Sequence, residues 1–402
     1  MTDRELLWHL ARVGLAAVDP HLLTLRALAG YRLRGPVDVL AVGKAALTMA
    51  EGAVEFLGQR LGEGLIIHPG GDTTPVVDPR FRVLTAAHPV PDASSLRAGA
   101  EALEWAAARP AGREVLWLVS GGASSLLEAL AEGVPAEALV ALNQWALASG
   151  HDIRRVNGLR RRLSRVKDGR LLARLAHCQV TALYLSDVPG DDPTVLASGL
   201  LGRAAVEDPL PADLPPELAT WLEAVDLPQG SPPPTRLACI GSIATAMAAV
   251  AEAGAVLGLP PPEQACLEGP VEGALAALRG CLEGSAAHWI VAGGETTIRL
   301  PPRPGRGGRN QHLALLASGW LEDRGEGAFL ALATDGRDGP GAAAGALVDS
   351  ATLERGRAAG CDPADSLASA SSGTFLASSG DLLVTGPTGT NVGDLVICKI
   401  TP

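Results

Sequence analysis

The chain has 402 residues, of which 47% are hydrophobic and only 3% aromatic, and its formal net charge is −11. This length exceeds a single hydrophobic core, which seldom grows past about 250–300 residues, so we expect two domains. Scarce aromatic side chains argue against a stacking surface for single-stranded nucleic acid, and the negative charge argues against duplex binding. The six cysteines are scattered without a CxxC pair, which disfavours zinc and disulfide frameworks and favours a reducing cytoplasm.

The first 20 residues, MTDRELLWHLARVGLAAVDP, are predicted to form an amphipathic helix because charged residues recur among the apolar ones. A secretory signal peptide would instead need a basic start and an uninterrupted apolar stretch. Elsewhere, no apolar run reaches the roughly 20 residues that a membrane-spanning helix requires. We therefore expect a cytoplasmic protein with no membrane and no nucleic acid among its partners.

Apolar runs alternate with helical patterns along the rest of the chain. The predicted strands are Val37–Val42, Gly64–Ile67, Val115–Val119, Val180–Leu185, Trp289–Val291, Phe329–Ala333 and Asp381–Val384. The predicted helices between them include Ala45–Leu57, Ser94–Ala108 and Gly273–Cys281. The alternation predicts an α/β fold with largely parallel sheets. The proline-rich stretch Asp226–Pro234 predicts a linker, and it divides the chain into domains at residues 1–230 and 235–402.

The stretch VLAVGKAA contains the first candidate site. A buried strand ends at Gly43, and Lys44 follows at the strand's carboxyl end, where α/β sheets bind ligands. Only three of the 33 basic residues are lysine, and a compact ammonium suits a phosphate or carboxylate. The alternative is an exposed lysine at a helix start.

The stretch LVSGGASSLL follows a later strand in the same way. Its glycines permit close backbone approach, and its serines offer hydroxyls and N–H groups at the start of a helix predicted through Leu130. Such a turn can bind an anion, or it can be a tight turn alone. The candidate residues here are Ser120, Gly121, Gly122, Ser124 and Ser125.

An arginine-rich helix is predicted within residues 151–173. Its apolar residues form a stripe at helical spacing, so a solvated basic face explains most of its arginines. Asn157, Arg160 and Lys167 are nevertheless candidates for reaching a polyanionic ligand.

The stretch YLSDVPGDDP brings acidic residues to the end of another strand. Asp187 and Asp191 suit a hard cation such as Mg²⁺, which prefers oxygen ligands. The alternative is an Asp-rich turn that satisfies its own backbone.

Glycine-rich turns carry the candidates of the second half. A glycine-rich loop, Pro301–Gly308, precedes an arginine whose planar donor fork can bind two phosphate oxygens. The candidates are Glu295, Arg309, Asn310, Asp335, Asp338, Thr390 and Asn391. Neither the phosphate-loop pattern GxxxxGK[ST] nor a GxGxxG dinucleotide pattern is present.

Taken in order, AVGKAA, HPVPDASS, LVSGGASSLL, VNGLRRRLSRVKDGRL, LSDVPGDD, GGETT, GRGGRNQ, ATDGRDGPGAAAG and VTGPTGTNVGDL resemble the motifs of the glycerate 2-kinase family with the MOFRL C-terminal domain. The resemblance covers nearly the whole chain. It implies ATP-dependent phosphorylation of D-glycerate to 2-phosphoglycerate with Mg²⁺. It also implies a Rossmann-like N-terminal domain with a mostly parallel sheet, a distinct α/β C-terminal domain, and an active site in the cleft between them.

Four motifs depart from the family pattern. The familiar GGRNQE reads GGRNQH, which places His312 where an acid is usual. KGG reads Lys167-Asp168-Gly169, SGP reads Ser198-Gly199-Leu200, and NVND reads Asn391-Val392-Gly393-Asp394. The first change removes a carboxylate from position 312, and the others are interpreted as loop drift.

Roles follow from the resemblance as hypotheses. Lys44 and Arg309, at the positions of the family's functional lysine and arginine, would hold phosphoryl oxygens. Asp187 or Asp191 would bind Mg²⁺ or accept the hydroxyl proton. The other candidates would bind substrate or nucleotide. Two alternatives are an NAD(P)H-dependent hydroxypyruvate reductase, which the missing nucleotide pattern disfavours, and a non-catalytic sensor of a phosphorylated metabolite. A homodimer is compatible with the sequence.

Overall fold

Two compact units make up the chain. The computed structural model describes residues 1–70, 78–151, 153–203, 209–225, 227 and 232–401. The first unit is Pro20–Ile240, and the second unit joins Met1–Asp19 to Gly241–Pro402. This division departs from the predicted domains because residues 1–19 belong to the second unit and residues 235–240 to the first. Most of the predicted linker, Asp226–Pro234, lies outside the described residues.

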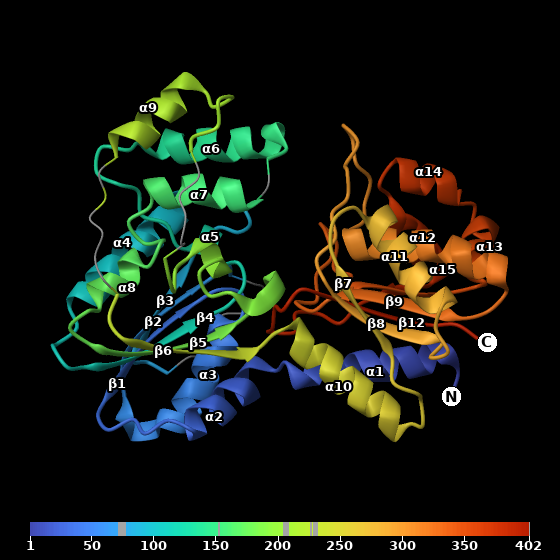
Figure 1. Ribbon diagram of the computed structural model, residues 1–402, viewed down its shortest axis with the longest axis horizontal. Helices are drawn as coiled ribbons and strands as arrows, with labels where there is room; N and C mark the ends of the chain where they lie inside the picture. Colours follow the sequence, from blue (N-terminus) through green and yellow to red (C-terminus); the bar gives the residue numbers. More distant parts are fainter. Residues whose placement is uncertain (71–77, 152, 204–208, 226, 228–231, 402) are drawn as a thin grey trace. The chain divides into compact units, whose positions relative to one another are not determined.

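The first unit is built on a six-stranded sheet in the order β3-β2-β1-β4-β5-β6 (Figure 1). The strands are β1 (Val37–Val42), β2 (Leu61–His68), β3 (Phe81–Thr85), β4 (Glu114–Val119), β5 (Gln179–Leu185) and β6 (Thr235–Gly241). The pairings of β1 with β2, β1 with β4, β2 with β3 and β4 with β5 are all parallel. This arrangement confirms the expected Rossmann-like parallel sheet.

Helices cover both faces of this sheet (Figure 1). They are α2 (Pro20–Ala29), α3 (Ala46–Leu57), α4 (Ala93–Ala107), α5 (Ala123–Leu126), α6 (Ala136–Ser149), α7 (Ile153–Leu163), α8 (Arg170–Arg174) and α9 (Pro216–Ala224). α2 and α3 lie on one face, and α4 and α8 pack on the other. α6, α7 and α9 enclose a smaller apolar cluster of their own.

The central strands β1, β4 and β5 form where the sequence is apolar enough to be buried on both sides. All six residues of β1, VDVLAV, are buried, including the carboxylate of Asp38. A buried carboxylate needs a counter-charge, and Arg109 Nη1 lies 2.8 Å from Asp38 Oδ2. The backbone N–H of Glu63 donates to the other oxygen at 2.9 Å. Asp38, the charged residue of this strand, therefore finds its ion-pair and hydrogen-bond partners within the first unit.

The second unit contains a six-stranded mixed sheet in the order β11-β10-β9-β12-β8-β7. The strands are β7 (Glu263–Leu267), β8 (Trp289–Gly294), β9 (Ala328–Ala333), β10 (Gly345–Asp349), β11 (Leu382–Leu383) and β12 (Asp394–Lys399). β7 and β8 pair in parallel, whereas β12 lies antiparallel between β8 and β9. The expectation of largely parallel sheets therefore holds for the first unit alone, because the last strand of the chain inserts into the middle of the second sheet.

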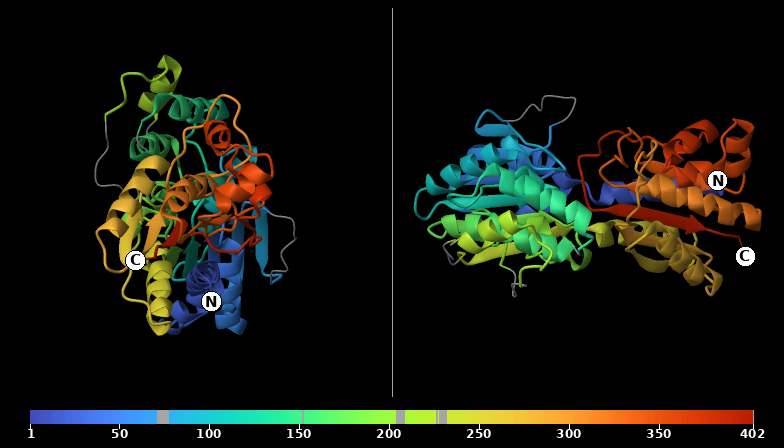
Figure 2. Two further views of the ribbon diagram at one scale, coloured as in Figure 1. Left: turned by 90° about the vertical axis from the view of Figure 1, so that its right-hand side faces the viewer. Right: turned by 90° about the horizontal axis from the view of Figure 1, so that it is seen from above.

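Helices also cover both faces of the second sheet. They are α1 (Asp3–Ala17), α10 (Ile243–Val256), α11 (Val271–Glu283), α12 (Arg309–Arg324), α13 (Thr352–Ala358), α14 (Pro363–Ala368) and α15 (Ser372–Ser379). α1 lies beside α10 on one face, and the other helices cover the opposite face (Figures 1 and 2). The amphipathic helix predicted at the start of the chain is confirmed. No helix within the described residues is long and apolar enough to cross a membrane.

Candidate functional site

Two of the predicted motifs meet where the strand order of the first sheet reverses. β1 lies between β2 and β4, so the chain winds outward in opposite directions from this point. Val42 and Val119 are register partners, which places Gly43 and Ser120 at the same level beyond the two strands. Ligands of open parallel sheets bind outside the carboxyl ends of the strands at such a reversal. The topology therefore brings the Lys44 turn and the serine–glycine turn to one candidate binding edge.

Hydrogen bonds hold these two turns together. The backbone N–H of Lys44 donates to the carbonyl of Gly121 at 2.9 Å, and that of Ala45 donates to Ser120 Oγ at 3.0 Å. Gly43 has a φ of +127°, and a Cβ there would lie 2.2 Å from Ser120 Oγ. Only glycine permits this approach. Ser120 is thus a structural link between the turns, because its hydroxyl is buried and accepts an internal hydrogen bond.

The turn after β4 is followed by a helix of four residues, α5, which is much shorter than predicted. Gly122 precedes it in the left-handed region, and the chain is extended again at Leu127. A Cβ on Gly122 would lie 3.0 Å from the His88 ring and 3.2 Å from Lys44 Cγ. Lys44, Gly122 and His88 are therefore neighbours. His88 was not a predicted site residue, although its motif, HPVPDASS, was part of the family resemblance.

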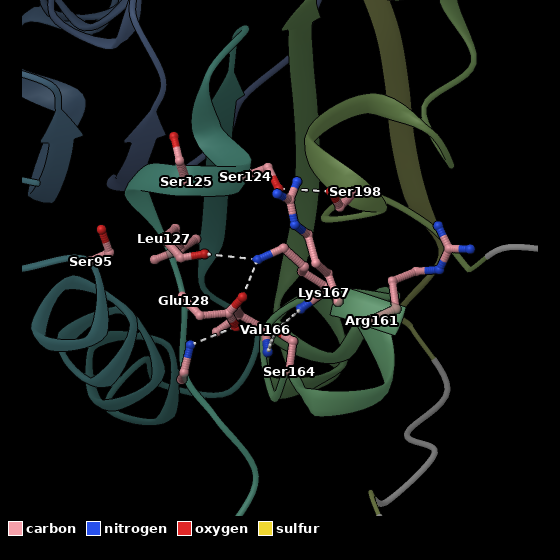
Figure 3. Close-up of polar contacts among 12 residues, drawn as sticks. Ser95, Ser124, Ser125, Leu127, Glu128, Arg161, Ser164, Val166, Lys167 and Ser198 are labelled. Atoms are coloured by element: carbon pink, nitrogen blue, oxygen red, sulfur yellow. Dashed lines mark hydrogen bonds and ion pairs between the residues drawn. The ribbon is translucent and has the colours of Figure 1, made fainter. Parts of the chain in front are cut away.

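An open pocket lies beside this turn, entirely within the first unit. It encloses about 510 Å³ including its mouth. Its lining residues are His88, Pro89, Pro91, Gly122, Ser124, Ser125, Glu128, Leu139 and Arg160. Ser124 Oγ lies 2.7 Å from Ser198 Oγ (Figure 3). Ser198 in turn donates to Asn157 Oδ1 at 3.0 Å. The structure therefore joins the predicted serines to Arg160 in one pocket and links Ser124 to Asn157 through Ser198.

Arg160 brings a positive charge to this pocket, and within the described residues its side chain bonds to neutral amides. Its Nη2 donates to Asn143 Oδ1 at 3.0 Å, and its Nη1 donates to Asn157 Oδ1 at 3.4 Å. Its buried Nε has no hydrogen-bond partner among the described residues. Burial lowers the pKa of Arg160, and the charge of Glu128 partly opposes this shift. Because both acceptors are neutral amides, the site suits a small anion.

Lys167 does not reach a ligand from its position in the structure. Its side chain is fully buried, and its Nζ lies 2.5 Å from Glu128 Oε2 (Figure 3). The same ammonium donates to the carbonyl of Leu127 at 3.5 Å. Lys167 is thus an internal partner of a pocket residue, and the prediction that it could bind a polyanion directly is wrong.

The predicted acidic residues follow β5, the strand next to β4. Asp187 is half-buried just after the strand, and Asp191 ends the 3₁₀ turn Pro189–Asp191. Asp192 satisfies its own turn, since its Oδ1 accepts from the N–H and hydroxyl of Thr194. No group of three His, Cys, Asp or Glu side chains that could hold a metal was found in the part of the chain that the structure describes. Because Mg²⁺ often needs only one or two carboxylates plus substrate phosphates, the role of Asp187 and Asp191 stays a prediction.

Arg309 anchors a second cluster, which lies within the second unit. Its Nε and Nη2 donate to the two carboxylate oxygens of Asp394 at 2.6 and 3.1 Å, and its Nη1 pairs with Glu295. Asp394 is 1% exposed, and burial raises its pKa to about 6 although the charge of Arg309 opposes the shift. The fork is thus fixed from one side by a bidentate partner. Asp394 was not predicted, although its stretch was noted as a departure from the family pattern.

Asp338 caps the helix that begins at Arg309. Its carboxylate accepts from the backbone N–H groups of Asn310 and Gln311 at 3.1 and 2.8 Å, and from Gln311 Nε2 at 3.0 Å. Burial raises its pKa, and these hydrogen bonds oppose the shift. Gly308 permits the contact, since a Cβ there would lie 2.3 Å from Asp338 Oδ1. Asp338, predicted to bind a ligand, therefore supports the helix start with both of its oxygens.

Replacing Gly308 by alanine is expected to lower the free energy of unfolding by about 1–3 kcal/mol, because the methyl group must displace packed atoms. Gly319→Ala in the same helix is the matched control. Its new methyl group would meet no atom closer than Leu353 Cδ1 at 4.0 Å, so we expect a gain of up to about 1 kcal/mol. Urea unfolding followed by circular dichroism measures both variants. Equal unfolding midpoints would contradict the close approach at Gly308.

Several polar atoms at this edge of the second sheet are buried without a partner. Asp394 is opposite Gly294 of β8 and Ala333 of β9, so the loops carrying Glu295, Asp335 and Thr390 gather there. Within the described residues, Thr296 Oγ1, Asn310 Oδ1 and Thr390 Oγ1 have no hydrogen-bond partner. Buried polar atoms are nearly always paired with protein, water or ligand. The edge is therefore suited to a polar ligand.

The remaining predicted residues of this cluster are held by the backbone or buried. Asp335 Oδ1 accepts from the N–H of Arg337 at 3.0 Å, and Asn391 is buried beside Thr390. His312, at the position where the resemblance leads one to expect an acid, is also buried. Burial lowers the pKa of His312, which favours a neutral ring. His312 therefore does not replace the charge of the acid that the family has at this position.

Comparisons with known proteins agree with the predicted family. Residues 6–209 match the model of a domain of unknown function, DUF4147, and residues 288–394 match the MOFRL family. A D-glycerate 2-kinase of Thermotoga maritima is 35% identical over 98% of this chain and 97% of its own. A protein of Agrobacterium vitis, provisionally named hydroxypyruvate reductase, is 35% identical over 98% of this chain and 94% of its own.

The likeness extends to a solved structure. The crystal structure of glycerate kinase from Thermotoga maritima matches with a TM-score of 0.84 and 31% identity, over 99% of this chain and 99% of that one. The chain therefore belongs to the glycerate kinase family, in which it combines a DUF4147 region with a C-terminal MOFRL domain.

Proposed function

We propose that the protein is a glycerate kinase that transfers the γ-phosphate of ATP to the 2-hydroxyl of D-glycerate, giving 2-phosphoglycerate, with Mg²⁺ as the metal ion. The observation that carries the proposal is the strand-order reversal of the first sheet. There Lys44 and the serine–glycine turn lie beside a pocket whose cation, Arg160, is bonded to neutral amides. A small carboxylate substrate and a phosphate both suit this combination of charges.

The carboxylate of glycerate is assigned to Arg160, which lines the pocket and has a buried Nε without a hydrogen-bond partner among the described residues. The hydroxyl hydrogens of Ser124 and Ser125 are used within the protein. Ser198 donates to Asn157, so Ser124 donates to Ser198 Oγ at 2.7 Å, and Ser125 donates to the carbonyl of Gly122 at 3.0 Å. A three-carbon acid held by its carboxylate keeps its hydroxyls free to face the phosphate donor.

Transfer of the phosphoryl group requires a bond from the 2-hydroxyl oxygen to the γ-phosphorus and cleavage of the bond to ADP. Lys44 and Arg309 supply the cations for the phosphoryl oxygens, and Asp187 either accepts the hydroxyl proton or binds Mg²⁺. Positioning and charge neutralisation dominate such reactions, because the transition state is loose.

The product decides between the proposed function and its rival. The protein is incubated with D-glycerate, ATP and Mg²⁺, and the phosphoglycerate isomer is identified by ³¹P NMR while ADP release is followed. Oxidation of NADH with hydroxypyruvate is measured in parallel, because two relatives carry the reductase name. We expect 2-phosphoglycerate and no NADH oxidation. NADH oxidation without ADP release would overturn the kinase in favour of the reductase, and ligand-dependent stabilisation without turnover would indicate a sensor.

The turnover number is expected to fall as the pH is lowered through about 6. Burial raises the pKa of Asp394 from its ordinary 3.8 to about 6, so its carboxylate is charged above this pH and neutral below it. A neutral Asp394 binds the fork of Arg309 less firmly. We expect Asp394→Asn to have a lower kcat at neutral pH and to lose this part of the pH dependence. The same acidic limb in both proteins would exclude Asp394 as its source.

A further inference from the structure

Lys167 is buried next to the pocket residue Glu128 and has no role in the mechanism proposed above. Its position suggests such a role. We propose that Lys167 is a positioning residue that keeps the Glu128 carboxylate away from Arg160, so that Arg160 stays available for the carboxylate of the substrate. This inference rests on the proposed function, since it deepens the assignment of the substrate carboxylate to Arg160.

Glu128 is held firmly on the side of Lys167. Glu128 is 2% exposed and Lys167 is fully buried, and their charged atoms lie 2.5 Å apart. The other Glu128 oxygen accepts from the N–H of Ala129 at 3.0 Å. The backbone of Lys167 is fixed in turn, because its N–H donates to the buried Ser164 Oγ at 3.1 Å (Figure 3). Both oxygens of Glu128 are therefore occupied by groups outside the pocket.

Glu128 nevertheless borders the pocket that Arg160 also lines. Its negative charge is the electrostatic influence that favours the charged form of Arg160. The hydrogen bonds of Arg160, however, go to the amide oxygens of Asn143 and Asn157. The carboxylate that could neutralise Arg160 from within the protein is thus committed to Lys167.

The type of residue at position 167 fits this role. Loss of the ammonium would leave Glu128 buried and uncompensated, which is strongly unfavourable, and Arg160 would be the cation at hand to relieve it. A Glu128–Arg160 pair would compete with an anionic substrate. A lysine makes this internal pair as a compact point charge, without the wide donor fork of an arginine. In a chain with three lysines among 33 basic residues, the choice is notable.

The proposal predicts unequal effects of removing the two charges. Lys167→Met should raise KM for D-glycerate about 10–100-fold, the range typical of residues that orient a ligand-binding group, with KM for ATP nearly unchanged. Glu128→Gln should leave KM for D-glycerate close to the wild-type value, since no competing carboxylate remains. The double variant Lys167→Met/Glu128→Gln should recover most of the loss. A purely structural pair would instead make the two single variants similarly defective and give no selective recovery.

The experiment measures steady-state kinetics and calorimetric binding of D-glycerate for the wild type, both single variants and the double variant, with thermal unfolding as a folding check. If Lys167→Met fails to fold, Glu128→Gln and the double variant still decide, because both must bind D-glycerate nearly as well as the wild type. If the wild type is an active kinase but Glu128→Gln and the double variant do not bind D-glycerate, the inference about Lys167 is overturned and the proposed kinase function stands. Binding in the expected order without any turnover overturns the proposed kinase alone, and a wild type that does not bind D-glycerate overturns both.

Discussion

Replacing Arg309 by lysine is expected to lower kcat about 100- to 1,000-fold, the usual effect of removing one well-placed donor from a phosphoryl-transfer or oxyanion site. Lysine keeps the positive charge but lacks the planar guanidinium that donates hydrogen bonds to both carboxylate oxygens of Asp394. Its ammonium would therefore bind Asp394 or a phosphoryl oxygen, but not both in a fixed plane. Steady-state kinetics with D-glycerate and ATP measure the loss.

Lysine is a sharper probe than alanine at this position. Alanine would leave Asp394, which is 1% exposed, without its counter-charge and would weaken the fold as well as the site. Arg299→Lys is the matched control, because Arg299 is an exposed arginine of the same unit. A kcat within about twofold of the wild type for Arg309→Lys, when the control is also unchanged, would remove the arginine fork from the mechanism.

Replacing Lys44 by methionine is expected to lower kcat/KM about 100- to 1,000-fold, since methionine keeps the bulk of the side chain and removes its charge. The backbone of Lys44 is bonded to Gly121, and its side chain passes beside Gly122. The charge is therefore delivered to the edge where β1 and β4 end. Lys44→Arg should restore little of the activity, because the larger guanidinium does not replace a compact ammonium in a fixed turn.

The chain offers a matched control for this variant. Lys399 forms a partly exposed ion pair with Asp3 at 2.8 Å, at the opposite end of β12 from Asp394. Such pairs contribute about 1 kcal/mol or less, so Lys399→Met should leave kcat/KM unchanged. If Lys44→Met matched Lys399→Met in activity, Lys44 would not belong to the site.

The sequence predicted most of the strands that are buried on both sides, because an uninterrupted apolar run is typical of a buried strand. β1, β4 and β9 end within one residue of their predicted bounds. β3, β6, β7 and β10 were missed. β3, β6 and β7 are edge strands with exposed positions, and β10 is buried but only five residues long. The helix after Gly122 was predicted too long for a related reason. Leu127 follows α5 in an extended conformation and is buried as fully as it would be in a helix.

Site residues were predictable where a strand end fixes their position, as at Lys44 and the serine–glycine turn. The charged residues that pair with them from distant parts of the sequence could not be predicted. Asp394 lies 85 residues beyond Arg309, and Glu128 lies 39 residues before Lys167. No local pattern links such pairs, because tertiary folding alone brings them together. For the same reason the sequence assigned Lys167 and Asp338 to ligand binding, whereas the structure pairs both of them internally.

The placement of α1 has a consequence for dissecting the protein. This helix belongs to the second unit, where Leu7 and Leu10 are buried against Trp289 and Ile397, yet the chain then builds the whole first unit before it returns at Gly241. A fragment starting at Gly241 would lack α1 and would therefore expose the apolar residues that α1 covers. A fragment ending at Ile240 would carry α1 with its own apolar side exposed. Expressing the MOFRL-bearing half alone calls for a rearranged gene in which residues 1–19 are spliced ahead of residue 241.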